Sequence, residues 1–322
     1  MRFIGSKTLL IKEIEKIIND KVENADSLCD IFAGTTVVGR YFKKKYKIIS
    51  NDFLHFSFVL QKATIENQIY PQFKKINTHL KSDPITYINQ KDVHINDLDN
   101  TPFIYENYSP ASKDNRKYFT EENALKIDYV RQKIEKWRNT DLLSENEYYY
   151  LLAGLIEAVP YISNIAGTYG AYLKHWDKRA YKKLDLVKLE TINNNKKNRC
   201  YNIDSEELIK TISGDIIYID PPYNSRQYAP NYHLLETISR YDSPEIYGVT
   251  GMRPYQEIKS KFCLKNDALN SFSHLIQNAN FKHIIFSYST EGIMSVKDIK
   301  NVLVKYGVEK TFYLKEIPYR RY

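Results

Sequence analysis

The stretch Gly214-Asp215-Ile216-Ile217-Tyr218-Ile219-Asp220-Pro221-Pro222-Tyr223 decides the fold of this chain. Its apolar part, residues 216–219, is a run of β-branched and aromatic side chains without alternation, which is typical of a strand covered on both faces in a parallel sheet. The two prolines end this strand, because proline has no N–H and restricts the residue before it. The stretch therefore predicts an α/β sheet with a stiff, polar segment at the carboxyl end of a strand, where open α/β sheets bind ligands.

The groups at the end of this strand suit the activation of an exocyclic amine such as that of adenine. That amine is a poor nucleophile because its lone pair is delocalised into the ring, and acceptors placed on its hydrogens would localise and aim the lone pair. The Asp220 carboxylate and the Pro221 carbonyl are such acceptors, held rigidly by the Pro221-Pro222 pair before any reaction starts. Tyr223 can stack on a base drawn out of a helix. The alternative for the four residues alone is a proline turn with a surface aspartate.

Two earlier strands supply further candidate residues. A strand over residues 27–32 runs into the turn Ala33-Gly34-Thr35-Thr36-Val37-Val38-Gly39 and then a helix. Gly34 permits a tight turn close to a ligand, and such strand–glycine–helix turns bind nucleotide-like ligands. The turn lacks the second early glycine of the dinucleotide fingerprint, so NAD is not indicated. The next strand, residues 47–50, ends at Asp52, where an acidic residue about twenty residues past the turn commonly binds ribose hydroxyls; a simple turn aspartate is the alternative.

Three segments together resemble the adenine-N6 DNA methyltransferases of the alpha group, which include Dam-type and FokI-type modification enzymes. They are Arg2-Phe3-Ile4-Gly5-Ser6-Lys7, Asp30-Ile31-Phe32-Ala33-Gly34 and the Asp-Pro-Pro-Tyr motif. Their order is also similar: a lysine-bearing N-terminal segment, the cofactor loop, a long insert and the catalytic motif. The resemblance spans nearly the whole chain, and the stretch from Asn224 through Glu236 is closer to the FokI type than to Dam.

The resemblance implies S-adenosylmethionine as the cofactor. In this family Lys7 would contact its methionine end, Asp30 opens the cofactor loop that continues through Phe32 and Gly34, and Asp204 would bind its adenine amine. Asp204 follows a third strand near residues 200–203 and fits a helix N-cap equally well. Lys7 precedes a predicted amphipathic helix over residues 8–20, and because a cation there opposes the helix dipole, we expect Lys7 to have a specific partner. No metal is implied.

Between about residues 71 and 199 the alternation of strands and helices disappears. One helix is predicted to begin at Thr120, and a second opens with the capping box of Ser144 and Glu147 and ends before Pro160. A glycine-hinged aromatic segment, residues 164–174, follows them.

Basic residues follow this segment. Lys174, Lys178 and Lys182 are spaced four apart and would share one face if helical, with Arg179 beside them. A solvated lysine face is the alternative, but the position inside the family's variable insert favours contacts to DNA phosphates.

The remainder of the chain carries fewer signals. Arg226 and Tyr228 are expected to lie against the flipped nucleotide and the adjacent DNA. A helix near residues 269–276 leads into a strand over residues 283–289. The last residues, 319–322, are expected inside a closing hairpin of the sheet with a short edge strand.

Composition limits the class of protein. The 322 residues include 47 Lys and Arg against 39 Asp and Glu, a net charge of +8 that favours a polyanionic partner. The 28 tyrosines suit stacking on bases, although an AT-rich genome also enriches tyrosine. Three cysteines without C-x-x-C spacing indicate a reducing compartment without a disulfide framework. The longest apolar stretch is too short to span a bilayer, so a cytoplasmic protein without a membrane partner is expected.

We therefore predict an α/β fold, a Rossmann-like class I methyltransferase sheet from residues 1–74 and 201–322 with a helical target-recognition insert at residues 75–200. The expected reaction is methyl transfer to the N6 amine of a flipped adenine in duplex DNA, within a restriction-modification system whose cognate endonuclease acts independently. Cytosine-N4 methylation is disfavoured because that group usually has Ser in place of Asp220, and protein glutamine methylation because Asn usually stands there. A non-catalytic DNA-binding regulator on the same scaffold is disfavoured by the joint presence of Gly34, Asp52, Asp220 and Tyr223.

Overall fold

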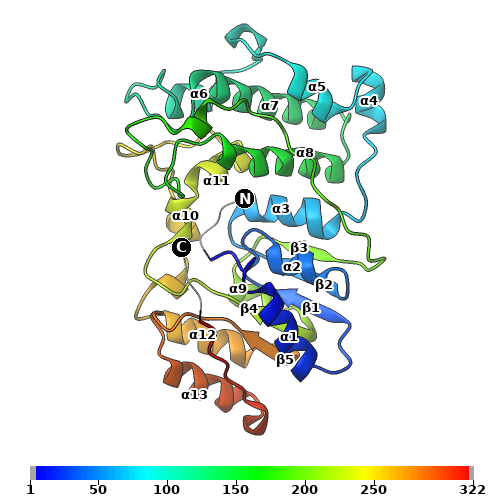
Figure 1. Cartoon of the computed structure of the whole chain (residues 1–322), viewed down its shortest axis with the longest axis vertical. Helices are drawn as coiled ribbons and strands as arrows, with labels where there is room; N and C mark the ends of the chain where they lie inside the picture. The colour runs from blue at the N-terminus through cyan, green and yellow to red at the C-terminus, as the bar shows by residue number, and fades with distance from the viewer. Residues whose placement is uncertain (1–4, 319–322) are drawn as a thin grey trace.

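A parallel sheet forms the centre of the computed structural model, which describes residues 5–318 (Figure 1). Its strands are β1 (Ser27–Asp30), β2 (Lys47–Asn51), β3 (Arg199–Tyr201), β4 (Ser213–Ile219) and β5 (Asn280–Phe286). They lie in the order β3-β2-β1-β4-β5, and all four strand pairs are parallel. The predicted parallel α/β sheet is thus confirmed. The chain moves outward from β1 to β3 and then returns to place β4 on the other side of β1, so the topological switch point lies between β1 and β4.

Strand β4 is covered on both faces, as its unbroken apolar run predicts. Ile216 and Tyr218 pack in a cluster with α1 (Ile11–Lys21) and α2 (Val37–Phe42). Ile217 and Ile219 point to the opposite face, into a cluster with α9 (Ser205–Leu208), α12 (Ala268–Gln277) and α13 (Val296–Tyr306). These four β4 residues are at most 1% exposed, so the strand end is held by core packing on both sides.

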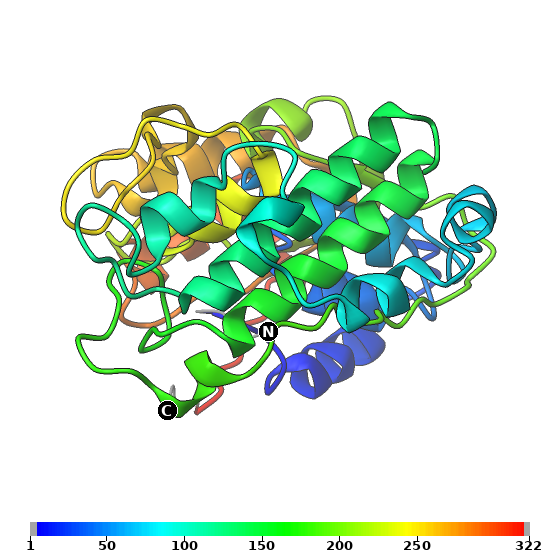
Figure 2. The ribbon, with the colours of Figure 1, turned by 90° about the horizontal axis from the view of Figure 1, so that it is seen from above.

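A layer of helices lies beyond the sheet and is seen from above in Figure 2. Its members are α3 (His55–Gln61), α4 (Lys74–Leu80), α5 (Pro84–Gln90), α6 (Phe103–Tyr108), α7 (Glu121–Asn139), α8 (Glu145–Ala158), α10 (Tyr228–Asn231) and α11 (His233–Arg240). The predicted helix starts are confirmed: the Thr120 hydroxyl accepts from the Asn123 N–H, and the Ser144–Glu147 capping box is present. Helices α4 to α6 are short and were not predicted.

The insert shares one hydrophobic core with helices from outside it. Buried residues of α7 and α8 belong to the same cluster as Phe56 and Val59 of α3 and Leu234 and Leu235 of α11. The proposed boundaries at residues 75 and 200 therefore mark an insertion in the sequence, and the hydrophobic core is continuous across them. The helices within residues 5–318 include none that is long and apolar enough to cross a membrane.

One local prediction is wrong. Residues 171–177 are not helical and only a 3-10 turn, Lys178–Tyr181, follows, so Lys174, Lys178 and Lys182 do not share a helix face. The reason is Asn164, whose side chain donates to the Leu173 carbonyl (3.0 Å) and accepts from the Asp177 N–H (2.8 Å), which holds the segment in an open loop.

The closing hairpin over residues 319–322 stays a prediction. Residues 312–318 form no strand, while residues 319–322 lie outside the described part of the chain, as do Arg2, Phe3 and Ile4 of the N-terminal motif.

Candidate active site

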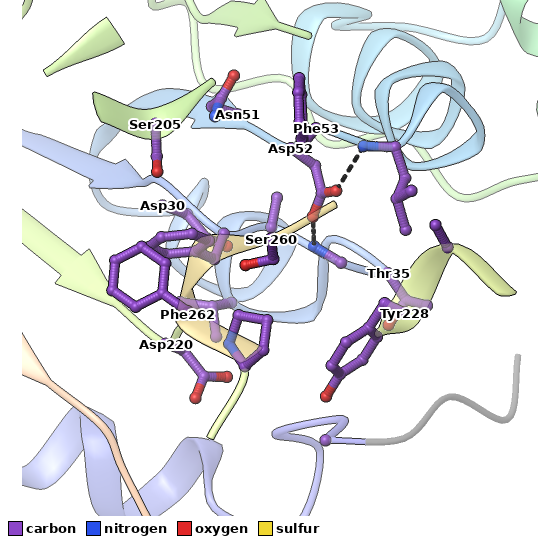
Figure 3. Close-up of a pocket in the computed structure, with 18 of the residues that line it drawn as sticks. Asp30, Thr35, Asn51, Asp52, Phe53, Ser205, Asp220, Tyr228, Ser260 and Phe262 are labelled. Carbon is purple, nitrogen blue, oxygen red and sulfur yellow. Dashed lines mark hydrogen bonds between the residues drawn. The ribbon is translucent and has the colours of Figure 1, made fainter. Parts of the chain in front are cut away.

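A pocket lies at the carboxyl ends of the strands, beside the switch point between β1 and β4 (Figure 3). Its walls come from the N-terminal segment, the turns after β1, β2, β3 and β4, and the segment 258–262. Nine of the residues predicted from the sequence line it: Lys7, Asp30, Phe32, Gly34, Asp52, Asp204, Asp220, Pro222 and Tyr228. The other predicted residues are not among its lining: Pro221, Tyr223, Lys174, Lys178, Arg179, Lys182 and Arg226.

Asp220 follows the last residue of β4 and forms an ion pair with Lys7. The Lys7 Nζ lies 2.5 Å from Asp220 Oδ2, and the two side chains are 12% and 16% exposed. Burial raises the pKa of Asp220 above its ordinary value, while the positive charge of Lys7 acts in the opposite direction. Lys7 therefore has the specific partner that its place before α1 predicts, and its Nζ also donates to the Gly5 carbonyl (3.0 Å).

Asp30 ends β1 as a buried carboxylate. Its Oδ2 accepts from the Gly39 N–H (3.2 Å) in the first turns of α2, whereas Oδ1 is buried without a hydrogen-bond partner among the described residues. Burial, with a smaller contribution from the Asp220 charge, raises the pKa of Asp30 to about 8. A buried oxygen without a partner is unfavourable, so this atom marks a place where a ligand donor would be stabilising.

The glycine turn is fixed by Asp52. Gly34 has a φ of 51°, the left-handed region in which glycine is not strained, and its N–H donates to Asp52 Oδ2 (2.7 Å). The other oxygen, Oδ1, accepts from the Leu54 N–H (2.9 Å). Burial raises the pKa of Asp52 to about 6. Asp52 thus joins the turns after β1 and β2, as a turn residue would, and it also lines the pocket.

The far wall of the pocket was not predicted. Phe262 meets the predicted Phe32 edge to face, with ring centroids 5.2 Å apart. Lys261 forms an ion pair with Glu206 (2.9 Å), next to Asp204, whose side chain caps α9 by accepting from the Glu206 N–H (2.7 Å). The cap expected for Asp204 is therefore present, and Asp204 also lines the pocket. The segment 256–263 consists of short 3-10 turns, which carry no periodic pattern to signal its place.

The two tyrosines that follow Asp220 differ in position. Tyr228, expected against the flipped nucleotide and the adjacent DNA, lines the pocket at the start of α10, with its ring stacked on Tyr232 at 6.2 Å between centroids. Tyr223 lies outside the lining, where its ring meets Tyr288 edge to face at 6.5 Å and its carbonyl accepts from the Ile293 N–H (2.8 Å). The chain leaves the pocket lining at Tyr223 and comes back to it at the start of α10, which places Tyr228 in the pocket wall.

The chemistry of the pocket fits S-adenosylmethionine. The partnerless Asp30 oxygen, the carboxylates of Asp52 and Asp204 and the acceptor-rich strand ends suit a ligand with amine, hydroxyl and cationic groups. The Phe32–Phe262 pair supplies apolar surface for a planar ring.

Comparison with known proteins identifies the family. A sequence model of the D12 class N6 adenine-specific DNA methyltransferases matches residues 3–302. The chain belongs to this family. M.FokI, a type II methyltransferase of Planomicrobium okeanokoites, is 50% identical over 323 residues, which cover the whole chain and 50% of that protein. The modification methylase StsI of Streptococcus sanguinis is 47% identical over the whole chain and 49% of its own length.

A third relative matches over most of its own length. M.NlaIII of Neisseria lactamica, a type II methyltransferase, is 38% identical over the whole chain and 92% of that protein. The chain spans about half the length of M.FokI and StsI. No solved structure matches the chain. The resemblance to adenine-N6 DNA methyltransferases is thus confirmed.

The basic residues predicted to contact DNA lie outside the pocket. Lys174, Lys178 and Lys182 are exposed on the insert, as is Arg226 beyond the catalytic motif. Arg179 is held differently: its guanidinium donates to both oxygens of Asp177 (3.0 and 2.9 Å) and to the Ile165 carbonyl (3.1 Å). Because its charge is paired within the loop, Arg179 is less suited to phosphate contact than the three lysines.

Proposed function

We propose that this chain transfers a methyl group from S-adenosylmethionine to the N6 amine of a flipped adenine in duplex DNA. The observation that carries the proposal is the position of Asp220 at the end of β4, facing the same pocket as Asp30, Gly34 and Asp52. We further propose that it is the modification enzyme of a restriction-modification system, with a cognate endonuclease that acts independently. Family membership supports this and gives no support to a regulator or to cytosine-N4 methylation.

The cofactor would be held by carboxylates and aromatic rings of the Rossmann-like class I methyltransferase sheet. Asp30 and the glycine turn would hold its amino-acid end together with Lys7, Asp52 its ribose, and Asp204 its adenine amine beside Phe32. When bound, S-adenosylmethionine supplies a methyl group activated by a sulfonium. These assignments would give the buried Asp30 Oδ1, which has no hydrogen-bond partner among the described residues, a donor from the cofactor.

The reacting amine would be oriented by Asp220 and the Pro221 carbonyl. Both are acceptors fixed by the buried strand β4 and by the stiff prolines, so they are arranged before the adenine arrives. Asp220 accepts best in its ionised form, which Lys7 favours by lowering the pKa of that carboxyl. Asp220 need not be a strong base, because the amine proton becomes acidic once the nitrogen is methylated. Tyr223 would support the flipped base by stacking at the rim.

The proposal is tested with purified protein, duplex DNA of mixed sequence and S-adenosylmethionine, followed by sequencing with modified-base detection. N6-methyladenine should appear at one recurring sequence. Asp220→Ala should abolish it while cofactor affinity, measured by calorimetry, stays within roughly tenfold, since the interaction is made mainly in the transition state.

A matched control is Asp215, the aspartate within β4 itself. Asp215 lies at the opposite end of the strand, where it accepts from the Ser27 hydroxyl (2.8 Å) and pairs with Lys282 (2.6 Å). Asp215→Asn should lower stability but keep methylation. Methylation that persists in Asp220→Ala, or modification of cytosine by the wild type, would overturn the proposal.

A further inference from the structure

Helix α11 carries a buried carboxylate outside the pocket. Every residue from His233 to Ser239 is buried, and the Glu236 side chain is 1% exposed. A carboxylate at such a position is strongly unfavourable unless it is paired and hydrogen-bonded. Its partners therefore show what it does in the fold.

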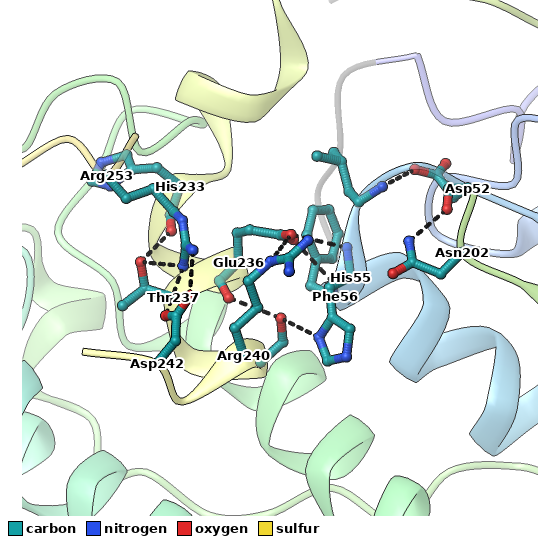
Figure 4. Close-up of polar contacts among 12 residues, drawn as sticks. Asp52, His55, Phe56, Asn202, His233, Glu236, Thr237, Arg240, Asp242 and Arg253 are labelled. Carbon is teal, nitrogen blue, oxygen red and sulfur yellow. Dashed lines mark hydrogen bonds and ion pairs between the residues drawn. The ribbon is translucent and has the colours of Figure 1, made fainter. Parts of the chain in front are cut away.

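Glu236 reaches across to the first turn of α3 (Figure 4). Its Oε1 accepts from the His55 N–H (3.1 Å) and its Oε2 from the Phe56 N–H (3.2 Å). Oε1 also accepts from Arg240 Nε (2.6 Å), which balances the charge. The N-cap residue of α3 is Leu54, which has no side-chain acceptor to offer. Glu236, which is 180 residues from Phe56 in the sequence, thus accepts from two backbone N–H groups in the first turn of α3, the part of a helix whose N–H groups have no acceptor within the helix.

The same helix start belongs to the wall of the cofactor pocket. Asn51, Asp52, Phe53 and Leu54 all line the pocket, and His55 follows directly. Three consecutive amides are divided between two carboxylates: Asp52 accepts from Leu54, and Glu236 accepts from His55 and Phe56. The three N–H groups lie on one turn of the backbone. The hydrogen bonds from His55 and Phe56 to Glu236 therefore fix the orientation of the Leu54 N–H, and the Leu54 N–H in turn holds the Asp52 carboxylate.

The outer end of α11 is anchored to the insert. The Arg253 guanidinium donates to both oxygens of Asp242 (3.1 and 2.6 Å), just past the helix. The adjoining segment is bound by Arg116, which donates to the Val249 carbonyl (2.9 Å) and the Gly248 carbonyl (3.1 Å). The outer end of α11 is therefore tied to the segment 248–253, which Arg116 of the insert holds.

We propose that Glu236 is a positioning residue for cofactor binding, which acts by clamping the start of α3 and so orienting Asp52 in the pocket. This inference rests on the proposed function, because it assumes that the pocket takes S-adenosylmethionine. Glu236 is not among the residues that line the pocket, so it would act through the start of α3 and not by touching the cofactor. Its removal should weaken cofactor binding and raise KM for S-adenosylmethionine, with kcat at saturating cofactor little changed.

The test uses Glu236→Gln, which keeps the shape and one acceptor but removes the charge. Calorimetry should show S-adenosylmethionine bound about tenfold more weakly, the scale of a weakened charged hydrogen-bond set. The matched control is Glu135→Gln in α7. Glu135 also lies in the helical layer and also pairs with an arginine, Arg131 (2.6 Å), but this ion pair joins two residues of α7 and, within the described residues, Glu135 accepts no hydrogen bond from the start of α3. The control substitution should lower thermal stability without changing cofactor affinity.

A double-mutant cycle separates positioning from general destabilisation. In an Asp52→Asn background, Glu236→Gln should weaken cofactor binding little further, because the residue through which it acts is already altered. An unchanged affinity in folded Glu236→Gln, or the same tenfold weakening in both backgrounds, would overturn the inference. If Glu236→Gln does not fold, Glu236→Asp, which keeps the charge beside Arg240 but shortens the reach, should show the same pattern.

The outcomes also separate this inference from the proposed function. A wild type that binds S-adenosylmethionine but does not methylate adenine would refute the proposed function alone. A wild type that methylates adenine, with Glu236→Gln binding the cofactor equally well, would refute the role of Glu236 alone.

Discussion

The Lys7 ammonium lies 2.5 Å from Asp220 Oδ2. It thus contacts the carboxylate that we propose accepts a hydrogen bond from the adenine amine. Lys7 and the amine are both donors, so they share or compete for the same acceptor. Burial raises the pKa of Asp220 and the positive charge of Lys7 acts against that rise, so the ion pair favours the ionised form of the carboxylate.

The first prediction concerns Lys7→Met, which keeps the length of the side chain and removes its charge. Without the ammonium, the pKa of Asp220 should rise further, and the acid limb of the pH profile of kcat/KM should move to higher pH. Lys7→Arg, which keeps a cation, should leave that limb near its original place. A Lys7→Met enzyme with the wild-type acid limb would show that Lys7 does not tune Asp220.

Asp30 should make the stability of the protein depend on pH. Its pKa is raised from 3.8 to about 8, so between these values the folded state holds a proton that the unfolded state has released. Stability should therefore fall as pH rises from about 4 to about 8, by up to about 1.4 kcal/mol per pH unit from this group. Asp30→Asn, which has no proton to release, should show a flatter curve in urea unfolding without cofactor. Parallel curves for the two proteins would contradict the buried, protonated Asp30.

The strand ends and turns of the site could be predicted because their signals are local. Gly34, Asp52 and Asp220 each follow an apolar run, and the ends of parallel strands meet at one edge of a sheet whatever the connections between them. The wall of Lys261 and Phe262 could not be predicted, since it comes from a segment without periodicity that the tertiary fold brings beside Phe32, after β1, and Glu206, after β3.

Helix α11 shows a second limit of prediction from the sequence. Its apolar residues Leu234, Leu235 and Ile238 follow a helical spacing, but the pattern covers only eight residues. Its polar residues would be assigned to solvent from the sequence, and only the packing of α3 against them shows that Glu236 is buried and bound. The lysines of the insert show the opposite error. Their spacing of four predicts a helix, but the hydrogen bond from the Asp177 N–H to Asn164 holds the segment in an open loop.

Those lysines lead to the third prediction. Lys174, Lys178 and Lys182 are exposed on the insert, and replacing all three by Ala should weaken binding to every DNA sequence. The slope of log affinity against log salt should become shallower by about one unit for each DNA phosphate that a lysine neutralises in the wild type.

The control removes the same charge from the opposite end of the molecule. Lys297, Lys300 and Lys305 are exposed on α13, which lies far from the insert (Figure 1). Their replacement by Ala should change the salt slope less than replacement of the insert lysines. Equal slopes for the two triple variants would mean that the insert lysines are merely solvated.

The last prediction concerns Tyr223, whose ring lies outside the pocket lining against the edge of Tyr288. If the ring stacks on the extruded adenine, its removal should weaken the flipped complex by about 1–3 kcal/mol, while Tyr223→Phe should keep most of that energy. Turnover should therefore fall far more in Tyr223→Ala than in Tyr223→Phe.

Fluorescence distinguishes stacking from packing at this position. A target adenine replaced by 2-aminopurine should brighten when the wild type binds, because unstacking relieves quenching, although the tyrosine ring quenches part of the gain. In Tyr223→Ala the probe should either brighten further or be flipped less stably. If Tyr223 only packs the loop near Ile293, the Ala variant should be less thermally stable and the Phe variant should not. Equal turnover in stably folded Phe and Ala variants would exclude the stacking role, because only the ring distinguishes them.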